Sequence, residues 1–423
     1  MSKNVLVSFS GAKNIQARIA LTGSKSECNR ALVISALSRG LVRVDNHSNA
    51  ADTVTLNRIL SELAVQGTDE RAQVDVGPAG TAMRFLTAYL AVLPGSFHLT
   101  GTERMKQRPI GILVDALHAI GAKIGYAGQE GFPPLDIDGG FEQTAGSVEI
   151  AGDISSQYIS ALLMVAAVLP QGLELRIKGE LTSRPYVQMT LDMLAEAGIT
   201  HEWNGNTISI KQQNFGETTL TVEPDWSAAS YWYSIAALAE NAAIELPALR
   251  ESSLQGDSRI RSIMKDFGVQ TQTVAGGIAL ARDERSWPSA TLNLKDCPDL
   301  AQTIIVCAAA LGQNLSFTGL ETLKIKETDR IAALQNELAQ LGVTLTEENQ
   351  VYTLNCDNLH FPKRIFVKTY EDHRMAMAFA PLALLVDEVE IEDAEVVAKS
   401  YPDFWLHLEQ AGFGVKALQA EFN

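Results

Sequence analysis

One kind of segment recurs six times along the 423 residues of the chain. Each copy is rich in alanine and other apolar residues, and each is opened by small polar or charged residues. The copies begin near Ser26, Thr81, Ser155, Ser227, Asp299 and Asp372. Successive starts are therefore 55, 74, 72, 72 and 73 residues apart. A period of this length exceeds that of solenoid repeats and is large enough to build globular lobes.

A second series of helices follows the first. Its members carry apolar residues at i, i+3 and i+4 spacing, and each ends in a glycine suited to a left-handed C-cap. These glycines are Gly67, Gly121, Gly198, Gly268, Gly342 and Gly412. Between the helices lie short β-branched runs that predict strands, namely SVEIAG, LELRIKG, TISIKQ, LSFTG and IFVKTY.

Six repeats of about 72 residues, each with two helices and several strands, thus describe the whole chain. The first repeat is about 17 residues shorter, so we expect it to lack part of its strand layer. The Ala-rich helices are apolar on nearly all faces, which places them at the centre of each lobe with sheets outside. Three repeats per lobe give two lobes of ordinary domain size. The middle of the repeat, at residues 222–230, is the expected crossing point.

Charge and composition exclude several classes of function. A net charge of −16 without a run of five Lys or Arg residues argues against nucleic acid and anionic membranes as partners. The longest apolar run, residues 159–169, is too short for a membrane span, and the N-terminal segment MSKNVLVSFS lacks a secretory h-region. We therefore expect a cytoplasmic globular protein. The four cysteines show no CxxC spacing and predict buried thiols in place of disulfides or a zinc site: Cys28, Cys297, Cys307 and Cys356.

Basic residues stand where helices of both series begin. The Ala-rich helices carry Lys25, Arg30, Arg84, His373 and Arg374 in this position, and the second series carries Arg108, Arg184, Lys326, Arg330 and Lys399. A cation at a helix N-terminus opposes the helix dipole at a cost of about 0.3–1 kcal/mol. Because this happens in most repeats, the pattern predicts that helix entrances and side chains together bind anions. The alternative is that Glu327 and Asp329 neutralise their neighbours and that the other cations are solvated.

Polar residues near the same entrances add candidates. In GPAGTAMR, Gly80 would let the backbone approach a ligand, although a glycine turn with a threonine cap explains it equally well. In SSQ, residues 155–157 could clamp a hydroxyl or phosphate group, or Ser155 could be an N-cap. The carboxylates at these entrances are Asp299, Glu327 and Asp372, and each could instead be a favourable N-terminal anion.

Ten short motifs occur in the order and nearly at the spacing found in one enzyme family: LTGSKSECNRA, GPAGTAMR, RPIG, GDISSQY, SRPY, QGD, PDLAQT, KETDR, DHRMAMAF and AKSYPDF. Over essentially its full length the chain resembles the EPSP synthase (3-phosphoshikimate 1-carboxyvinyltransferase) family of enolpyruvyl transferases. KETDR together with DHRMAM is the most specific part. The resemblance implies an inside-out α/β fold of two lobes, residues 1–22 plus 226–423 (lobe I) and 23–225 (lobe II), with the active site in the cleft between them.

The resemblance also implies the reaction. Shikimate 3-phosphate and phosphoenolpyruvate would give 5-enolpyruvylshikimate 3-phosphate and phosphate, in aromatic amino acid biosynthesis, by a monomer that needs no cofactor or metal. Protonation of the enol, attack by a hydroxyl group and loss of phosphate require an acid, a base and phosphate clamps. By similarity, Glu327 carries the proton for C3, Asp299 takes the hydroxyl proton, and Lys25 contacts phosphoenolpyruvate and the attacking oxygen.

The remaining residues transfer by motif position. The expected contacts to phosphoenolpyruvate are Lys25, Gly80, Arg108, Gln157, Arg330, Arg374 and Lys399. The expected contacts to shikimate 3-phosphate are Lys25, Ser26, Arg30, Ser155, Ser156, Gln157, Ser183, Asp299 and Lys326. The chain departs from the family at Pro78, where many members have asparagine, and at Phe85, where proline is frequent.

Two other functions stay open. The sister enzyme that acts on UDP-N-acetylglucosamine carries a cysteine in the loop ahead of its RP motif, whereas here that loop reads GTERMKQRP, and no cysteine lies between Arg30 and Asp296. A non-catalytic anion-binding protein of the same fold would keep the arginines but would have no need of Asp299 and Glu327. The presence of both carboxylates favours the enzyme.

Overall fold

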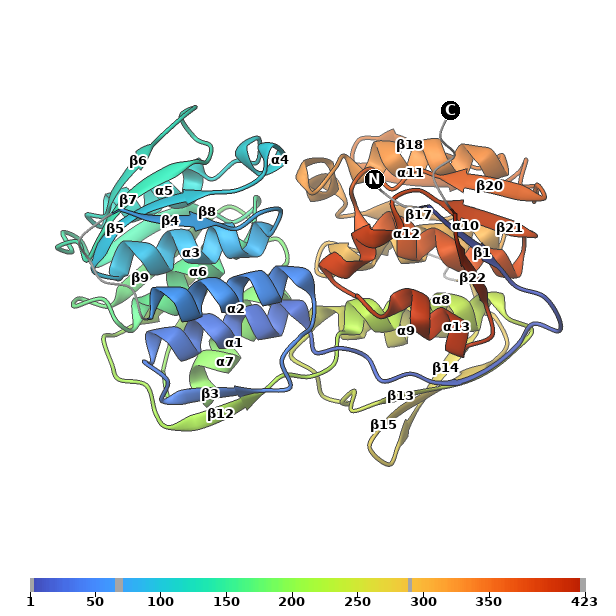
Figure 1. The fold of residues 1–423 in the computed structure, drawn as a ribbon, viewed down its shortest axis with the longest axis horizontal. Helices are drawn as coiled ribbons and strands as arrows, with labels where there is room; N and C mark the ends of the chain where they lie inside the picture. Colours follow the sequence, from blue (N-terminus) through green and yellow to red (C-terminus); the bar gives the residue numbers. More distant parts are fainter. Residues whose placement is uncertain (1–3, 65–70, 288–290, 419–423) are drawn as a thin grey trace. The chain divides into compact units, whose positions relative to one another are not determined.

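Three Ala-rich helices pack together in each of two compact units of the computed structural model, which describes residues 4–64, 71–287 and 291–418 (Figure 1). Unit I comprises Met1–Thr22 and Glu223–Asn423, and unit II comprises Gly23–Val222. The central helices of unit II are α1 (Lys25–Leu37), α3 (Gly80–Val92) and α6 (Ser156–Ala166). Those of unit I are α8 (Trp226–Leu238), α10 (Ala301–Ala310) and α12 (His373–Phe379). Nearly every side chain of α8, α10 and α12 is buried, as the apolar faces predict.

The second series of helices lies beside the first. Its members are α2 (Ala51–Leu63), α5 (Gly111–Ala119), α7 (Arg184–Glu196), α9 (Ile260–Asp266), α11 (Arg330–Leu338) and α13 (Phe404–Gln410). Five of the six predicted C-cap glycines have a positive φ, between 71° and 107°: Gly121, Gly198, Gly268, Gly342 and Gly412. Gly67 lies outside the described residues. The helix ends were therefore predictable from the glycines.

Sheets cover these helices, and each described sheet contains one parallel pair of strands. In unit I the sheet orders are β20-β21-β1-β22, β14-β15-β13-β2 and β16-β17-β19-β18. Their strands are β1 (Val5–Ser8), β2 (Asn14–Arg18), β13 (Asn241–Pro247), β14 (Val269–Val274), β15 (Gly277–Arg282), β16 (Leu292–Asn293), β17 (Ser316–Thr318), β18 (Thr344–Glu348), β19 (Val351–Asn355), β20 (Arg364–Val367), β21 (Glu388–Ile391) and β22 (Gly414–Ala417). The N-terminal segment belongs to unit I because β1 pairs with β21 and β22, while β2 pairs in parallel with β13.

Unit II follows the same plan with one exception. Its sheet orders are β4-β5-β7-β6, β10-β11-β9-β8 and β12-β3. Their strands are β3 (Val42–Asp45), β4 (Ala72–Asp75), β5 (Gly95–Thr100), β6 (Lys123–Tyr126), β7 (Leu135–Gly139), β8 (Ser147–Ala151), β9 (Leu173–Lys178), β10 (Glu202–Asn204), β11 (Thr207–Ile210) and β12 (Thr218–Thr221). Within the described residues, β12 and β3 form only the parallel pair, without the antiparallel strands that complete the other five sheets. The shortened first repeat is thus confirmed.

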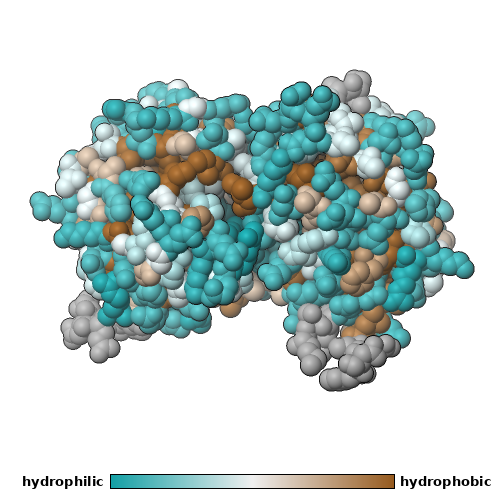
Figure 2. Space-filling model, turned by 90° about the horizontal axis from the view of Figure 1, so that it is seen from above, coloured by the Kyte–Doolittle hydropathy of each residue, from teal (hydrophilic) through white to brown (hydrophobic). Residues whose placement is uncertain are grey.

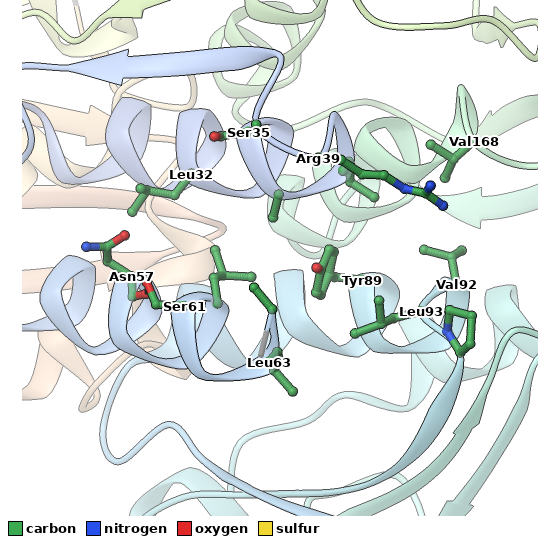
Figure 3. A pocket seen from close by; sticks show the side chains of 16 residues that line it. Leu32, Ser35, Arg39, Asn57, Ser61, Leu63, Tyr89, Val92, Leu93 and Val168 are labelled. Carbon is green, nitrogen blue, oxygen red and sulfur yellow. The ribbon is translucent and has the colours of Figure 1, made fainter. Parts of the chain in front are cut away.

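A groove of about 660 Å³ lies in this part of unit II, between α1, α2 and the C-terminal end of α3 (Figure 3). Apolar side chains from the three helices line it, including Leu32, Leu60, Leu63, Tyr89 and Val92. Elsewhere in unit II, strands of a sheet cover the helices: α3, for example, packs against β5 and β7. The groove therefore lies beside α1 and α2. These helices belong to the repeat whose described sheet, β12-β3, has two strands.

The surface is mostly hydrophilic on the face that Figure 2 presents, with smaller hydrophobic patches between the polar side chains. All four cysteines are free and buried, as predicted. None of the helices in the described ranges combines the length and the apolar character needed to cross a membrane.

Candidate functional site

In unit I the N-terminal ends of α10, α11 and α12 bring Asp299, Arg330 and Asp372 together. Pro298 opens the 3-10 helix η2 (Pro298–Leu300), which places Asp299 just before α10. Asp329 caps α11 by accepting hydrogen bonds from two backbone N–H groups, so Arg330 is the first residue of that helix. Asp372 caps α12 and accepts a hydrogen bond of 2.9 Å from the backbone N–H of Arg374. Local capping thus fixes the residue at which α11 and α12 begin, and with it the positions of Arg330 and Arg374.

Arg330 is the centre of this cluster and is 1% exposed. Its Nε lies 2.6 Å from Asp372 Oδ2, its Nη1 lies 3.2 Å from Asp299 Oδ1, and its Nη2 lies 2.9 Å from Glu327 Oε2. One planar guanidinium group therefore holds three carboxylates that come from three parts of the chain. Both predicted proton-transfer residues are fixed by the same cation.

Each of these two carboxylates also contacts a second predicted cation. Arg374 Nη2 lies 2.9 Å from Asp299 Oδ2, and Lys399 Nζ lies 3.5 Å from Glu327 Oε1. Lys399 is the last residue of η6 (Ala394–Lys399). The structure thus brings together five of the six unit I residues to which the sequence analysis assigned a catalytic or substrate-binding role.

The sixth residue, Lys326, follows the 3-10 helix η3 (Glu321–Ile325), and its charge acts on Asp299. Burial raises the pKa of Asp299, but neighbouring cations, first Arg374 and then Lys326, outweigh it and leave the pKa well below its usual range. Burial also lowers the pKa of Arg330, and the charge of Asp372, the largest opposing effect, leaves that pKa above its usual value. Asp299 is therefore a carboxylate at neutral pH, as a proton acceptor must be.

A further buried carboxyl group lies beside the cluster. Asp257 belongs to the 3-10 helix η1 (Gly256–Arg259), is 3% exposed and accepts a short hydrogen bond from the hydroxyl group of Ser227. Burial, followed by the charge of Asp299, raises the pKa of Asp257 to about 7. The sequence analysis assigned no role to Asp257, although this residue is the last one of the QGD motif.

In unit II, Lys25 begins α1 and pairs with a carboxylate from α2. Lys25 Nζ lies 3.2 Å from Asp52 Oδ2, and the two side chains are 13% and 3% exposed. The Ser24 hydroxyl caps α1 by accepting a hydrogen bond from the N–H of Glu27 at 3.4 Å. Asp52 was not predicted as a site residue, because an acid in the first turn of a helix is an ordinary feature.

Arg30, one turn further along α1, is tied into the interior of unit II. Its Nε donates to Thr190 Oγ1 at 2.7 Å, and its Nη1 donates to the carbonyl oxygen of Ser26 at 2.8 Å. Its guanidinium group lies 5.3 Å from the ring centroid of Phe85, one of the two departures from the family. Burial lowers the pKa of Arg30 to about 10. The guanidinium group supports the backbone at Ser26, and its predicted contact with a substrate phosphate stays a prediction.

Gly80 and Arg108 lie in direct contact in unit II. A Cβ atom on Gly80 would stand 2.5 Å from Arg108 Nη1, so glycine allows the guanidinium group of Arg108 to lie against the backbone here. Arg84 holds both segments, since its Nη1 donates to the carbonyl oxygen of Gly80 at 3.0 Å and its Nη2 to that of Pro109 at 3.1 Å. The sequence indicated only that Arg84 lies at a helix start, and the structure shows that it joins the Gly80 and Pro109 segments.

Gln157 joins this group through the next residue of α3. Its Nε2 donates to Thr81 Oγ1 at 3.3 Å. The hydroxyl group of Tyr158 donates to the Pro109 carbonyl oxygen at 2.6 Å, which gives the Arg108 segment a second support. Three predicted phosphoenolpyruvate contacts of unit II, Gly80, Arg108 and Gln157, are therefore neighbours.

The predicted serines begin two adjacent helices. Ser155 caps α6 by accepting a hydrogen bond from the N–H of Gln157, and Ser156 is the first residue of that helix. Ser183 precedes α7 with φ 55° and ψ 39°, a left-handed conformation that is uncommon for serine. The backbone N–H of Thr182 donates to the carbonyl oxygen of Gly152 at 2.9 Å and joins the two loops. Strain of this kind points to a functional position.

Comparison with known proteins identifies the family. The family model for EPSP synthase (3-phosphoshikimate 1-carboxyvinyltransferase) matches residues 9–408. The chain belongs to the EPSP synthase family. A 3-phosphoshikimate 1-carboxyvinyltransferase from Bacteroides fragilis (strain YCH46) is 46% identical over 410 residues, which cover 96% of this chain and 98% of that protein. One from Neisseria meningitidis serogroup B is 35% identical over 408 residues, covering 92% of this chain and 94% of that protein.

Solved structures agree on the fold. An EPSP synthase from Acinetobacter baumannii has a TM-score of 0.78 at 21% identity, covering 98% of this chain and 100% of that one. The enolpyruvyl transferase NikO from Streptomyces tendae has a TM-score of 0.70 at 15% identity, covering 99% of this chain and 100% of that one. The fold class predicted from the repeat and from the resemblance to the EPSP synthase family is confirmed.

Proposed function

We propose that this chain transfers the enolpyruvyl group of phosphoenolpyruvate to the 5-hydroxyl group of shikimate 3-phosphate, releasing phosphate. Membership of the EPSP synthase family over residues 9–408 supports the reaction. The observation that carries the assignment of roles is the shared contact of Asp299 and Glu327 with Arg330, at 3.2 Å and 2.9 Å. A base and an acid held by one buried guanidinium group suit a reaction with two proton transfers.

In the addition step, Glu327 in its protonated form gives its proton to C3 of phosphoenolpyruvate and becomes a carboxylate, while the 5-hydroxyl oxygen of shikimate 3-phosphate bonds to C2. Asp299 takes the hydroxyl proton, and the product is a tetrahedral intermediate that still carries the phosphate. In the elimination step, Glu327 removes a proton from C3, the C2–O bond to phosphate breaks, and the enol double bond forms again. The lowered pKa of Asp299 keeps this group ionised at neutral pH, so it has a free site for the proton.

Positive groups stabilise the anions throughout. Phosphoenolpyruvate would be bound from unit I by Arg330, Arg374 and Lys399, and from unit II by Lys25, Gly80, Arg108 and Gln157. Shikimate 3-phosphate would be bound by Lys25, Ser26, Arg30, Ser155, Ser156, Gln157, Ser183, Asp299 and Lys326. Two unit charges about 4 Å apart attract by about 4 kcal/mol at an effective dielectric constant near 20. The proposal requires the two units to contribute to one active site, in the cleft that the sequence analysis expects.

The test measures phosphate release by the purified full-length chain. With both substrates present we expect phosphate release, and with either substrate alone we expect none. Binding of both substrates by calorimetry without phosphate release would favour the non-catalytic anion-binding protein. Release that requires UDP-N-acetylglucosamine in place of shikimate 3-phosphate would favour the sister enzyme.

We also propose that the chain acts as a monomer in the cytoplasm, as the sequence predicts. Light scattering after size-exclusion chromatography measures the first property, and a mass of about twice 45.8 kDa would contradict it. Cell fractionation measures the second.

A further inference from the structure

A chain of buried hydrogen bonds follows Lys399 in unit I. Tyr401, two residues beyond Lys399, is fully buried, and its hydroxyl oxygen accepts a hydrogen bond of 3.0 Å from Trp232 Nε1 on α8. The same hydroxyl lies 2.8 Å from His407 Nδ1 on α13. With His407 neutral and its proton on Nε2, Nδ1 accepts the hydrogen bond from the Tyr401 hydroxyl group, whose oxygen accepts the one from Trp232.

These contacts hold the segment that carries Lys399 at both ends. At its start, the carbonyl oxygen of Ala394 accepts a hydrogen bond of 2.8 Å from Trp405 Nε1. At its end, the backbone N–H of Tyr401 donates to the carbonyl oxygen of Val397 at 2.8 Å, and the side chain is fixed to α8. Lys399 lies between these points, and its ammonium group reaches Glu327. A flexible lysine is thus carried by a short helix with both ends anchored.

Aromatic packing links the same segment to Arg374. Tyr401 and Phe404 meet edge to face with ring centroids 5.5 Å apart, and Phe404 meets Tyr231 in the same way at 5.8 Å. The hydroxyl group of Tyr231 accepts a hydrogen bond of 3.5 Å from Arg374 Nη1. Tyr401 therefore supports the neighbourhoods of two cations that are candidates for binding phosphoenolpyruvate.

We propose that Tyr401 is a positioning residue for phosphoenolpyruvate, because its hydroxyl group fixes the segment of Lys399 to α8 through Trp232 and to α13 through His407. Tyr401 touches no reacting atom in this proposal and acts through Lys399. The inference rests on the proposed function, and it concerns only how one of the two substrates is held. Loss of the hydroxyl group would leave the ring packing intact while freeing the backbone on which Lys399 depends.

The test compares Tyr401→Phe with a matched control. Tyr233 is also a fully buried tyrosine of unit I, and its hydroxyl lies 2.8 Å from Thr271 Oγ1, away from Lys399. We expect Tyr401→Phe to raise the KM for phosphoenolpyruvate about fivefold to tenfold, because the two hydrogen bonds that anchor the segment of Lys399 are lost. The KM for shikimate 3-phosphate should change less than twofold, and Tyr233→Phe should change neither value. An unchanged KM for phosphoenolpyruvate, or equal effects on both substrates, would overturn the proposal.

A double-mutant cycle separates positioning from general loss of stability. In a Lys399→Met background, Tyr401→Phe should have little further effect on the KM for phosphoenolpyruvate, because the group that it positions is absent. Equal effects in both backgrounds would show that Tyr401 does not act through Lys399. If the proposed function itself were wrong, the unaltered chain would release no phosphate. If only the role of Tyr401 were wrong, the chain would be active and Tyr401→Phe would leave the KM for phosphoenolpyruvate unchanged.

Discussion

Arg330 and Asp372 form a buried ion pair in unit I, with Nε 2.6 Å from Oδ2 and neither side chain more than 2% exposed. The same carboxylate caps α12 through the backbone N–H of Arg374. Asp372 thereby fixes the plane of the guanidinium group through Nε and, at 3.4 Å, through Nη2, while Nη1 donates to Asp299 and Nη2 also donates to Glu327. The two proton-transfer candidates are positioned by Asp372, which the sequence analysis named only as a carboxylate at a helix entrance.

Replacing Asp372 by asparagine should destabilise unit I. Asparagine can still cap α12, but the charge of Arg330 loses its closest partner inside the protein, which typically costs about 3–5 kcal/mol. Urea unfolding followed by tryptophan fluorescence measures the loss, since unit I holds four of the five tryptophans. As a control in the same unit, Glu245→Gln breaks the exposed pair with Arg18, where about 0.2–1 kcal/mol is expected. Similar losses in both variants would contradict the prediction.

Glu327→Gln should separate binding from turnover. Glutamine keeps the size of the side chain and an oxygen for Arg330, but it cannot give a proton to C3 of phosphoenolpyruvate. We expect phosphate release to fall by about 100-fold or more, while calorimetry still detects binding of shikimate 3-phosphate. Glu321→Gln, a change at an exposed glutamate on η3, is the control and should keep full activity. Turnover within tenfold of the original would remove Glu327 from the proton-transfer role.

Gly80→Ala should weaken the binding of phosphoenolpyruvate through Arg108. The new methyl group would stand 2.5 Å from Arg108 Nη1, so the guanidinium group must move. A displacement of about 1 Å can change the rate by two orders of magnitude, and we expect the KM for phosphoenolpyruvate to rise at least tenfold. Steady-state kinetics with each substrate varied in turn makes the measurement. Gly125→Ala in β6, where the nearest atom would be 3.9 Å away, should leave the KM unchanged.

Asp257 should make the stability of unit I depend on pH. Its pKa is raised to about 7, so between about pH 4 and pH 7 the folded state binds more protons than the unfolded state. Its contribution to stability is present below pH 4 and is lost as the pH rises through 7. Relative to Asp257→Asn, which has no carboxyl group, the original chain should lose about 1–4 kcal/mol between pH 4 and pH 8.

Urea unfolding at several pH values makes this measurement. A parallel pH profile for Asp257→Asn and the original chain would contradict the raised pKa. The variant Asp387→Asn, at an exposed position of unit I, is the control and should follow the original chain at each pH.

Much of the candidate site was predictable because the signals are local. Lys25, Arg330 and Arg374 stand in the first turns of helices whose starts are marked by capping residues, and Gly80 begins α3. The contacts that the prediction missed join residues that are far apart along the chain. Asp52 is 27 residues from Lys25, Asp372 is 42 from Arg330, and Tyr401 is 169 from Trp232. An acid or a tyrosine near a helix start is too common a feature to reveal such partners.

The sequence by itself determined the repeat, the two series of helices, five of the strands, the shortened first repeat and the family. These properties depend on apolar periodicity, caps and turn glycines, whose interactions span only a few residues. Only the tertiary structure decided that Arg330 holds three carboxylates, that Arg30 is bound within the interior of unit II and that Asp257 lies beside Asp299. Such contacts arise when distant helices pack together, because burial then strengthens each charge interaction and decides which groups must pair.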